Sequence, residues 1–135
     1  MVHAGRPLVL VVDDDTDCRE LVTELLDRNG YAARGVGSGH EALSAIDGGF
    51  EPDAVVLDLM MPEMNGWDLL DAMRRRPALA RTPVVVISAA CDAQRAPIEA
   101  SRVLSKPFRL QTLLTALARS MGAHAVRTTS DVPLG

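Results

Sequence analysis

Aromatic side chains are scarce in this chain of 135 residues, because Phe, Trp and Tyr together make up only 3% of it. Proteins often bind single-stranded nucleic acid by stacking its bases on aromatic rings, so a surface of that kind is not expected. The two cysteines, Cys18 and Cys91, have no spacing typical of a metal site. The sequence also lacks an apolar run long enough for a membrane span and a signal-peptide pattern. We therefore predict a cytoplasmic protein with reduced thiols and no membrane insertion.

Positive charge is also limited, with 14 Lys and Arg residues against 18 Asp and Glu residues and a net charge of -4. Apart from residues 74–76, the basic residues form no run, so we expect no direct contact with nucleic acid. Lysine is the rarest charged residue, since Lys106 is the sole lysine. A compact ammonium binds phosphate as a point charge, unlike the planar guanidinium of arginine. Lys106 is therefore a candidate for a specific role, although chance retention is an equally simple interpretation.

Apolar residues make up 47% of the chain, and its length suits one domain with a sizeable core. The runs VLVV, AVVL and VVVI are continuous, which indicates strands covered by helices on both faces of a parallel sheet. Amphipathic segments alternate with these runs, as in repeated βα units. The predicted strands are 8–12, 31–36, 54–57, 84–87 and 102–104, and the predicted helices are 18–28, 40–47, 67–75 and 110–121. We predict an N-terminal extension over 1–7, a domain over 8–121 and a flexible tail over 122–135.

Polar side chains directly follow several of the predicted strands, and ligands of an open parallel sheet bind beyond the carboxyl ends of its strands. These side chains are Asp13, Asp14 and Asp15 after the first strand, Asp58 after the third, Ser88 after the fourth and Lys106 after the fifth. Neighbouring carboxylates repel one another unless a cation joins them, and Mg²⁺ prefers oxygen ligands while retaining waters. Such an ion leaves room for phosphate oxygens, which a lysine and a hydroxyl can also bind. The pattern predicts a site for phosphoryl transfer.

Asp58 is the expected acceptor of the phosphoryl group. Ser88 has no His or Lys close to it in the sequence that could act as its base. Asp58, in contrast, is ionised at neutral pH and needs no activation as a nucleophile. Asp15 and Thr16 are more simply explained as caps of the first helix, and Asn65 as a turn residue.

The motifs VVDDD, DLMMPEMNG and SKPF, together with the lone Ser88, resemble the receiver domain of two-component response regulators. The resemblance extends from Leu8 to about Met121. It implies a flavodoxin-like, doubly wound α/β fold with a five-stranded parallel sheet in the order 2-1-3-4-5. The implied roles are phosphoacceptor for Asp58, acidic pair for Asp13 and Asp14, hydroxyl switch for Ser88, phosphoryl contact for Lys106 and a backbone carbonyl ligand to Mg²⁺ for Met60.

The resemblance also implies partners. Receivers take the phosphoryl group from a phosphohistidine on a sensor histidine kinase or a histidine phosphotransfer protein, and many accept small phosphodonors. The modified domain then changes a surface that contacts a downstream protein effector, which the sequence does not identify. Such a domain assists its own phosphorylation and dephosphorylation without being a multiple-turnover enzyme. We therefore predict a single-domain response regulator.

Two features depart from the family pattern. Receivers often carry Tyr or Phe three residues before the lysine, where this chain has Val103, and a valine cannot act as a rotating aromatic switch. The segment between Ser88 and Lys106 is several residues shorter than is usual, and Pro97 interrupts it. We expect a shortened or irregular fourth helix, and local mobility over 93–100.

Met60 and Ala90 lie two residues beyond Asp58 and Ser88, where receivers control the access of water to the acyl phosphate. Neither side chain can orient an attacking water molecule. We therefore expect slow self-dephosphorylation.

Three alternatives use the same residues. Asp13, Asp15, Asp17 and Glu24 match ligand positions of a calcium-binding EF-hand, but Cys18 replaces the required glycine and a strand precedes them. A haloacid-dehalogenase-like phosphatase would use Asp13 as its nucleophile, yet Asp17 stands where that family has Thr or Val. A degenerate receiver would bind a partner without phosphorylation, which the retention of every charged site residue argues against.

Overall fold

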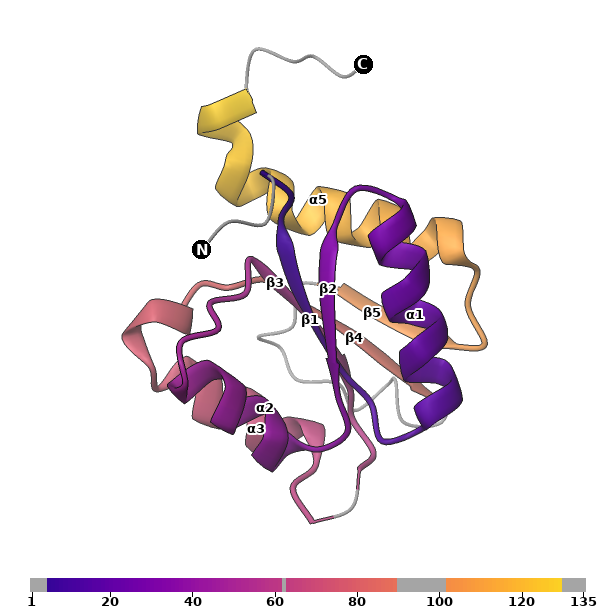
Figure 1. Cartoon of the computed structure of the whole chain (residues 1–135), viewed down its shortest axis with the longest axis vertical. Coiled ribbons are helices and arrows are strands. Elements are labelled where there is room, and N and C mark those ends of the chain that lie inside the picture. The colour runs from indigo at the N-terminus through magenta and orange to yellow at the C-terminus, as the bar shows by residue number, and fades with distance from the viewer. Residues whose placement is uncertain (1–4, 62, 90–101, 130–135) are drawn as a thin grey trace.

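The computed structural model describes residues 5–61, 63–89 and 102–129, which form one sheet flanked by helices (Figure 1). The strands are β1 (Leu8–Val12), β2 (Ala32–Val36), β3 (Ala54–Asp58), β4 (Val84–Ala89) and β5 (Arg102–Lys106). The helices are α1 (Thr16–Arg28), α2 (Gly39–Asp47), α3 (Gly66–Arg74), the short 3-10 helix η1 (Pro77–Leu79) and α5 (Leu110–Thr129). The predicted fourth helix and the predicted mobile segment fall outside the described residues.

All strand pairs are parallel, and the strand order is β2-β1-β3-β4-β5. The predicted α/β fold and its strand order are confirmed. β1, β3 and β4 lie in the interior of the sheet, and nearly all of their residues are buried. Their continuous apolar runs therefore predicted the fold correctly, since a strand covered on both faces needs apolar side chains at successive positions.

Successive residues of a strand point to opposite faces of the sheet, so each face has its own core. Figure 1 shows α2 and α3 on one face and α1 and α5 on the other. The core under α2 and α3 includes Leu10, Val12, Leu57, Leu69 and Met73, and the core under α1 and α5 includes Val9, Val11, Val22, Leu26 and Leu113. Each such aliphatic side chain contributes about 1.5–3 kcal/mol by its burial.

Side-chain caps fix where three of the helices begin. The carboxylate of Asp15 accepts a hydrogen bond from the Cys18 N–H at 3.2 Å. In the same way, Asn65 accepts from the Asp68 N–H at 2.9 Å at the start of α3. These contacts satisfy backbone donors that have no partner within the helix. The capping role expected for Asp15 is confirmed, and Asn65 is a cap rather than only a turn residue.

The end of α5 corrects the predicted boundary. The sequence predicts a helix over 110–121 and a flexible tail over 122–135, but α5 continues through Thr129. Residues 130–135 lie outside the described residues, and the flexibility of the tail stays a prediction. The sequence from 123 to 127, AHAVR, lacks an apolar period because this part of the helix extends beyond the sheet (Figure 1). Three of these five residues, two alanines and one arginine, are good helix formers. Within the described part of the chain, no helix is both long and apolar enough to cross a membrane.

Close packing at Gly66 ties the start of α3 to the end of β3. A Cβ atom at Gly66 would lie 2.7 Å from the Leu59 Cα and 2.9 Å from the Asp58 carbonyl oxygen. Because both neighbours are backbone atoms, Gly66→Ala should lower the free energy of unfolding by about 1–3 kcal/mol. Urea denaturation measures this loss.

The control for Gly66→Ala is Gly122→Ala, because nothing lies within 4 Å of the Cβ position at Gly122. This substitution inside α5 should leave stability unchanged or raise it by about 0.5–1 kcal/mol. A Gly66→Ala protein as stable as the wild type would contradict the close approach between α3 and β3.

Candidate functional site

The carboxyl ends of the parallel strands bring the predicted site residues to one edge of the sheet. Asp13 directly follows β1, and Asp58 is the last residue of β3. Ser88 is the last residue but one of β4, and it pairs in register with Ser105 of β5. Lys106, the last residue of β5, therefore lies at the same edge of the sheet. The sequence had predicted this convergence from residues far apart along the chain.

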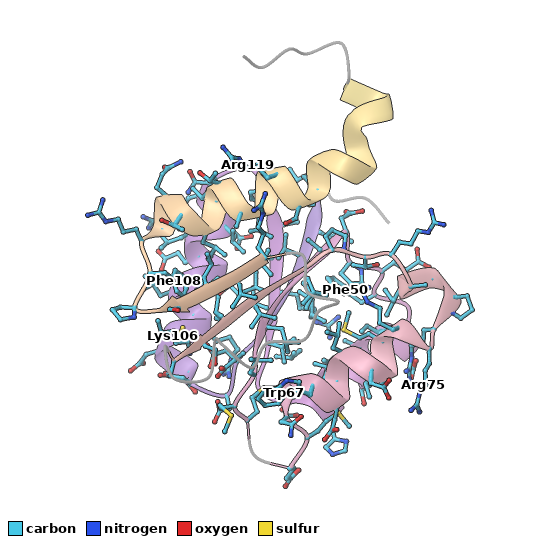
Figure 2. All side chains as sticks on the ribbon, turned by 180° about the vertical axis from the view of Figure 1, so that it is seen from behind. Phe50, Trp67, Arg75, Lys106, Phe108 and Arg119 are labelled. Atoms are coloured by element: carbon cyan, nitrogen blue, oxygen red, sulfur yellow. The ribbon has the colours of Figure 1, made fainter. Side chains whose placement is uncertain are left out.

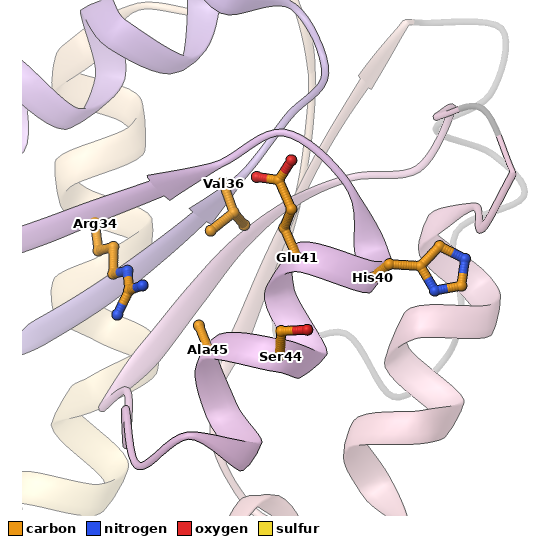
Figure 3. Close-up of a pocket in the computed structure, with 6 residues that line it drawn as sticks. All are labelled: Arg34, Val36, His40, Glu41, Ser44 and Ala45. Carbon is orange, nitrogen blue, oxygen red and sulfur yellow. The ribbon is translucent and has the colours of Figure 1, made fainter.

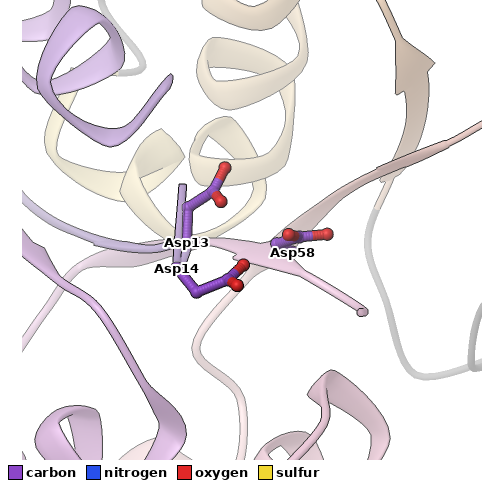
Figure 4. Close-up of side chains that lie close together, drawn as sticks. All are labelled: Asp13, Asp14 and Asp58. Carbon is purple, nitrogen blue, oxygen red and sulfur yellow. The ribbon is translucent and has the colours of Figure 1, made fainter. Parts of the chain in front are cut away.

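Three carboxylates form a compact cluster, which Figure 4 shows at the ends of β1 and β3. One oxygen atom from each of Asp13, Asp14 and Asp58 lies within 4.8 Å of the other two. Asp13 is fully buried and Asp58 is 6% exposed, whereas Asp14 is exposed to solvent. Oxygen donors at this spacing, open to water on one side, fit a hard divalent cation that keeps part of its hydration shell. The cluster therefore fits Mg²⁺, whose binding stays a prediction.

Lys106 bridges two of these carboxylates. Its Nζ atom lies 3.2 Å from Oδ2 of Asp13 and 3.6 Å from Oδ2 of Asp58. Burial alone would lower the pKa of Lys106, but the charges of Asp58 and Asp13 outweigh it and raise the pKa above its ordinary value. Lys106 therefore stays protonated and supplies positive charge to the cluster. Its specific role, suggested by its being the sole lysine, is supported by these contacts.

Ser88 places a hydroxyl group near the end of β4, at the same edge of the sheet. The residue is fully buried on β4. Its Oγ atom has no hydrogen-bond partner among the residues that the structure describes. A buried hydroxyl without a hydrogen-bond partner costs free energy. A bound phosphoryl oxygen atom would supply this partner, which favours a binding role for Ser88.

The environment of Asp58 changes its acidity. Burial raises the pKa of Asp58 to about 6, and the charges of Asp13 and Asp14 act in the same direction. The Lys106 charge and a hydrogen bond from the Met60 N–H to Oδ1, at 3.3 Å, partly oppose this rise. Asp58 is thus mainly ionised at pH 7, as its predicted role as nucleophile requires. Met60 places its backbone next to the Asp58 carboxylate, while ligation through its carbonyl group stays a prediction.

The raised pKa predicts how the stability of the metal-free protein depends on pH. The folded state binds the Asp58 proton more tightly than the unfolded chain, whose carboxyl has a pKa near 3.8. The free energy of unfolding should therefore fall as the pH rises from 3.8 to about 6, and then level off. A shift of about two pKa units corresponds to a contribution on the order of 2–3 kcal/mol.

Urea denaturation in the presence of a chelator, at several pH values, tests this dependence. Asp58→Asn should remove this part of the pH dependence and make the metal-free protein more stable at pH 7. If the wild type and Asp58→Asn lose stability equally between pH 4 and pH 6, the raised pKa is wrong.

Two residues near Asp13 were not predicted as site residues. The Cys18 thiol is hydrogen-bonded with the Asp13 side chain. The pKa of Cys18 is raised to about 12, mainly by burial and to a lesser extent by this hydrogen bond. Arg19 donates from Nη1 to the backbone oxygen of Asp13 at 2.9 Å. Both lie in the first turns of α1, where neither residue type carries a sequence signal for a site. Only the direction of their side chains in the folded protein reveals the contacts.

The structure excludes the EF-hand alternative. Asp15 caps α1 instead of facing a bound ion. Glu24 lies two turns further along the helix and forms an exposed ion pair with Arg28 at 2.6 Å. The four acidic residues of that reading therefore do not converge, because a helix rather than a calcium loop follows β1.

Three residues were tied to switching and to water access, and two of them, Val103 and Met60, lie in the described residues. Val103 is 39% exposed on β5, and Met60 is 49% exposed beside Asp58. Ala90 lies outside the described residues. The absence of an aromatic ring at residue 103 thus leaves a small apolar side chain at the surface of the sheet edge.

A separate open pocket of about 400 Å³ lies between β2 and α2 (Figure 3). Its lining residues are Arg34, Val36, His40, Glu41, Ser44 and Ala45. Glu41 accepts a hydrogen bond from the Gly37 N–H at 3.0 Å, and the guanidinium of Arg34 lies 5.3 Å from the ring centre of Phe50. None of the residues of the acidic site lines this pocket.

Comparisons with known proteins agree with this geometry. The family model of the response regulator receiver domain matches residues 9–118. The DNA-binding transcriptional regulator NtrC of Bradyrhizobium sp. (strain RP501 Parasponia) is 36% identical over 132 residues, which cover 94% of this chain and 27% of that protein. The DNA-binding response regulator MtrA of Mycobacterium tuberculosis (strain H37Rv) is 34% identical over 113 residues, covering 81% of this chain and 48% of that protein. The chain thus spans less than half the length of these curated relatives.

A solved structure supports the same fold. The chemotaxis response regulator CheY4 of Vibrio cholerae superposes with a TM-score of 0.77 at 29% sequence identity. The superposition covers 85% of this chain and 98% of that one.

Proposed function

The chain belongs to the response regulator receiver domain family, and we propose that it accepts a phosphoryl group on Asp58 in a Mg²⁺-dependent reaction. The donor is a phosphohistidine on a sensor histidine kinase or a histidine phosphotransfer protein. The observation that carries this proposal is the cluster of Asp13, Asp14 and Asp58, whose oxygen atoms lie within 4.8 Å of one another, with Lys106 bridging two of them. The proposal includes a cytoplasmic location.

In the proposed reaction, a carboxylate oxygen of Asp58 attacks the phosphorus atom of the donor. A P–O bond to Asp58 forms while the P–N bond to the donor histidine breaks, and the imidazole nitrogen leaves with the electron pair. Lys106 and Ser88 bind oxygen atoms of the phosphoryl group as it transfers. Asp13, Asp14, Asp58 and the backbone carbonyl of Met60 would hold Mg²⁺, which offsets negative charge on the phosphoryl oxygens.

The phosphorylated state would act as a switch rather than as part of a catalytic cycle. The new phosphoryl group competes for Lys106, which in the unmodified protein contacts the carboxylates of Asp13 and Asp58. Together with Ser88, this would shift the ends of β4 and β5 and change a surface that a downstream protein effector contacts. Because Val103 replaces the usual aromatic residue, the switch would work without a rotating ring. We also propose slow hydrolysis of the acyl phosphate, since the Met60 side chain cannot orient water.

The alternatives differ in what they require of the same residues. Asp13, the nucleophile of the phosphatase alternative, is fully buried and accepts hydrogen bonds from Lys106 and from the Asp15 N–H. The haloacid-dehalogenase-like phosphatases are also a different family from the receiver domains, to which this chain belongs. The expected absence of direct nucleic-acid contact stays a prediction, because NtrC and MtrA are described as DNA-binding regulators and are much longer than this chain. A degenerate receiver would show no phosphorylation in the following test.

Trp67 provides the reporter for the test of the proposed function. This residue lies in the first turn of α3, partly buried against the core, and toward the same end of the sheet as Lys106 (Figure 2). Its fluorescence should change saturably when Mg²⁺ is added, and change again when a small phosphodonor such as acetyl phosphate follows. With a chelator in place of Mg²⁺ the second change should disappear. A donor response of equal size without Mg²⁺ would contradict the proposed reaction.

A further inference from the structure

The side chain of Arg19 packs against Gly35 of β2 and against Gly37 in the loop that follows this edge strand. A Cβ atom at Gly35 would lie 2.9 Å from the Arg19 Cγ and 3.1 Å from its Cδ. A Cβ atom at Gly37 would lie 3.0 Å from Nη1 of the same arginine. β2 and the loop that follows it therefore leave open the space that Arg19 fills. Any other residue type at Gly35 would push the arginine stem away from the strand.

The guanidinium of Arg19 reaches the loop that carries the acidic pair. Its Nη1 donates to the backbone oxygen of Asp13 at 2.9 Å, in a partly buried contact. That oxygen belongs to the peptide group that joins Asp13 to Asp14. The hydrogen bond thus fixes the plane of this peptide group, from which the Asp14 backbone continues.

The two acidic residues depend on this peptide group to different degrees. The Asp13 side chain has anchors of its own, because Oδ1 accepts from the Asp15 N–H at 2.9 Å and Oδ2 contacts Lys106. The Asp14 carboxylate is exposed, and within the described parts of the chain no group donates a hydrogen bond to it. Its direction toward Asp58 is therefore set mainly by the backbone that Arg19 holds.

We propose that Arg19 is a positioning residue for the Mg²⁺ site, holding the Asp13–Asp14 peptide so that the carboxylates converge before the ion binds. This inference rests on the proposed function, because it assigns Mg²⁺ to the acidic cluster. Among the described residues, Arg19 donates to the backbone oxygen of Asp13 and to Thr16 Oγ1, and to no carboxylate of the cluster. It acts through the backbone, in the way that residues hydrogen-bonded to the ligands of a metal site commonly orient those ligands.

The charge and the position of Arg19 predict opposite effects on metal affinity. A positive charge near the cluster repels Mg²⁺, so removing it would by itself strengthen binding. If Arg19 positions the peptide, Arg19→Met should instead weaken Mg²⁺ binding by about tenfold. The dissociation constant is measured with MgCl₂ at fixed ionic strength, from Trp67 fluorescence and from the Mg²⁺-dependent rise in the thermal midpoint.

Three further variants complete the experiment. Arg28→Met removes an exposed arginine of the same helix that pairs with Glu24, and should leave Mg²⁺ affinity unchanged. Gly35→Ala keeps every charge but displaces the Arg19 stem, so it should weaken binding, and it should add little in the Arg19→Met background. Arg19→Lys keeps the charge and one donor, and should fall between the wild type and Arg19→Met.

The outcomes separate this inference from the proposed function. If the wild type binds Mg²⁺ and Arg19→Met binds it equally well or more tightly, the positioning role is wrong and the proposed function stands. Wild-type protein that does not bind Mg²⁺ contradicts both. Should Arg19→Met fail to fold, Gly35→Ala and Arg19→Lys decide the question, since unchanged affinity in both also overturns the role.

Discussion

Replacing Asp58 with asparagine should abolish phosphorylation of this protein completely. The carboxylate oxygen that would form the bond to phosphorus is lost, and the amide that replaces it is not a nucleophile at neutral pH. Asp58 is also one of the three residues whose oxygen atoms form the acidic cluster, so the variant should bind Mg²⁺ more weakly. Intact-protein mass spectrometry after incubation with acetyl phosphate and Mg²⁺ measures the effect.

The matched control is Asp71→Asn, which changes an exposed aspartate of α3 that pairs with Arg75. This variant should gain the phosphoryl group as fully as the wild type. Asp58→Asn should remain folded, because in the metal-free protein it removes a carboxylate that burial disfavours. Phosphorylation of a folded Asp58→Asn protein at the wild-type rate would refute the assignment of Asp58 as acceptor.

Replacing Lys106 with methionine should slow phosphorylation by about 100-fold, the typical loss when one donor that stabilises a transition state is removed. The methionine side chain has a similar length but carries no charge. Lys106 Nζ already lies within 3.6 Å of the acceptor carboxylate in the unmodified protein, so it needs little movement to reach a phosphoryl oxygen. The rate is followed through Trp67 fluorescence with acetyl phosphate as donor.

The same substitution should have the opposite effect on metal binding. Lys106 contacts Asp13 and Asp58 in the metal-free protein and so repels an incoming cation. Lys106→Met should therefore bind Mg²⁺ more tightly while it accepts the phosphoryl group more slowly. Lys106→Arg restores the charge but not the compact ammonium, and should recover only part of the rate. A wild-type rate in Lys106→Met would show that the lysine does not assist the transfer.

The sheet could be predicted well from the sequence because both faces of its central strands are buried. Residues such as Val55 and Val85 are buried on β3 and β4, and continuous apolar runs of this kind occur mainly in strands covered on both sides. Helix ends were predicted less well. α1 begins at Thr16 because Asp15 caps it, two residues before the predicted start. α5 extends past Met121 because residues such as Ala and Arg favour helix even where the sequence has no apolar period.

The candidate site could be predicted from sequence for a related reason. Asp13, Asp58, Ser88 and Lys106 each lie at or next to the carboxyl end of a strand that its apolar residues make recognisable, and parallel strands end at a common edge. The contacts of Cys18 and Arg19 with Asp13 could not be predicted, because they depend on where side chains of α1 point and on the space above Gly35. The raised pKa of Asp58 likewise depends on burial, which the residue's place in the sequence does not reveal.

The central claim is that one carboxylate, Asp58, accepts a phosphoryl group at a Mg²⁺ site. The most direct test treats wild-type protein with acetyl phosphate, reduces the product with borohydride, and locates the modified residue by peptide mass spectrometry. Reduction converts an acyl phosphate on aspartate to homoserine. We expect homoserine at residue 58 when Mg²⁺ is present and an unmodified chain when a chelator replaces it. Modification at Asp13 or Ser88 instead, or equal modification of Asp58 without Mg²⁺, would contradict it.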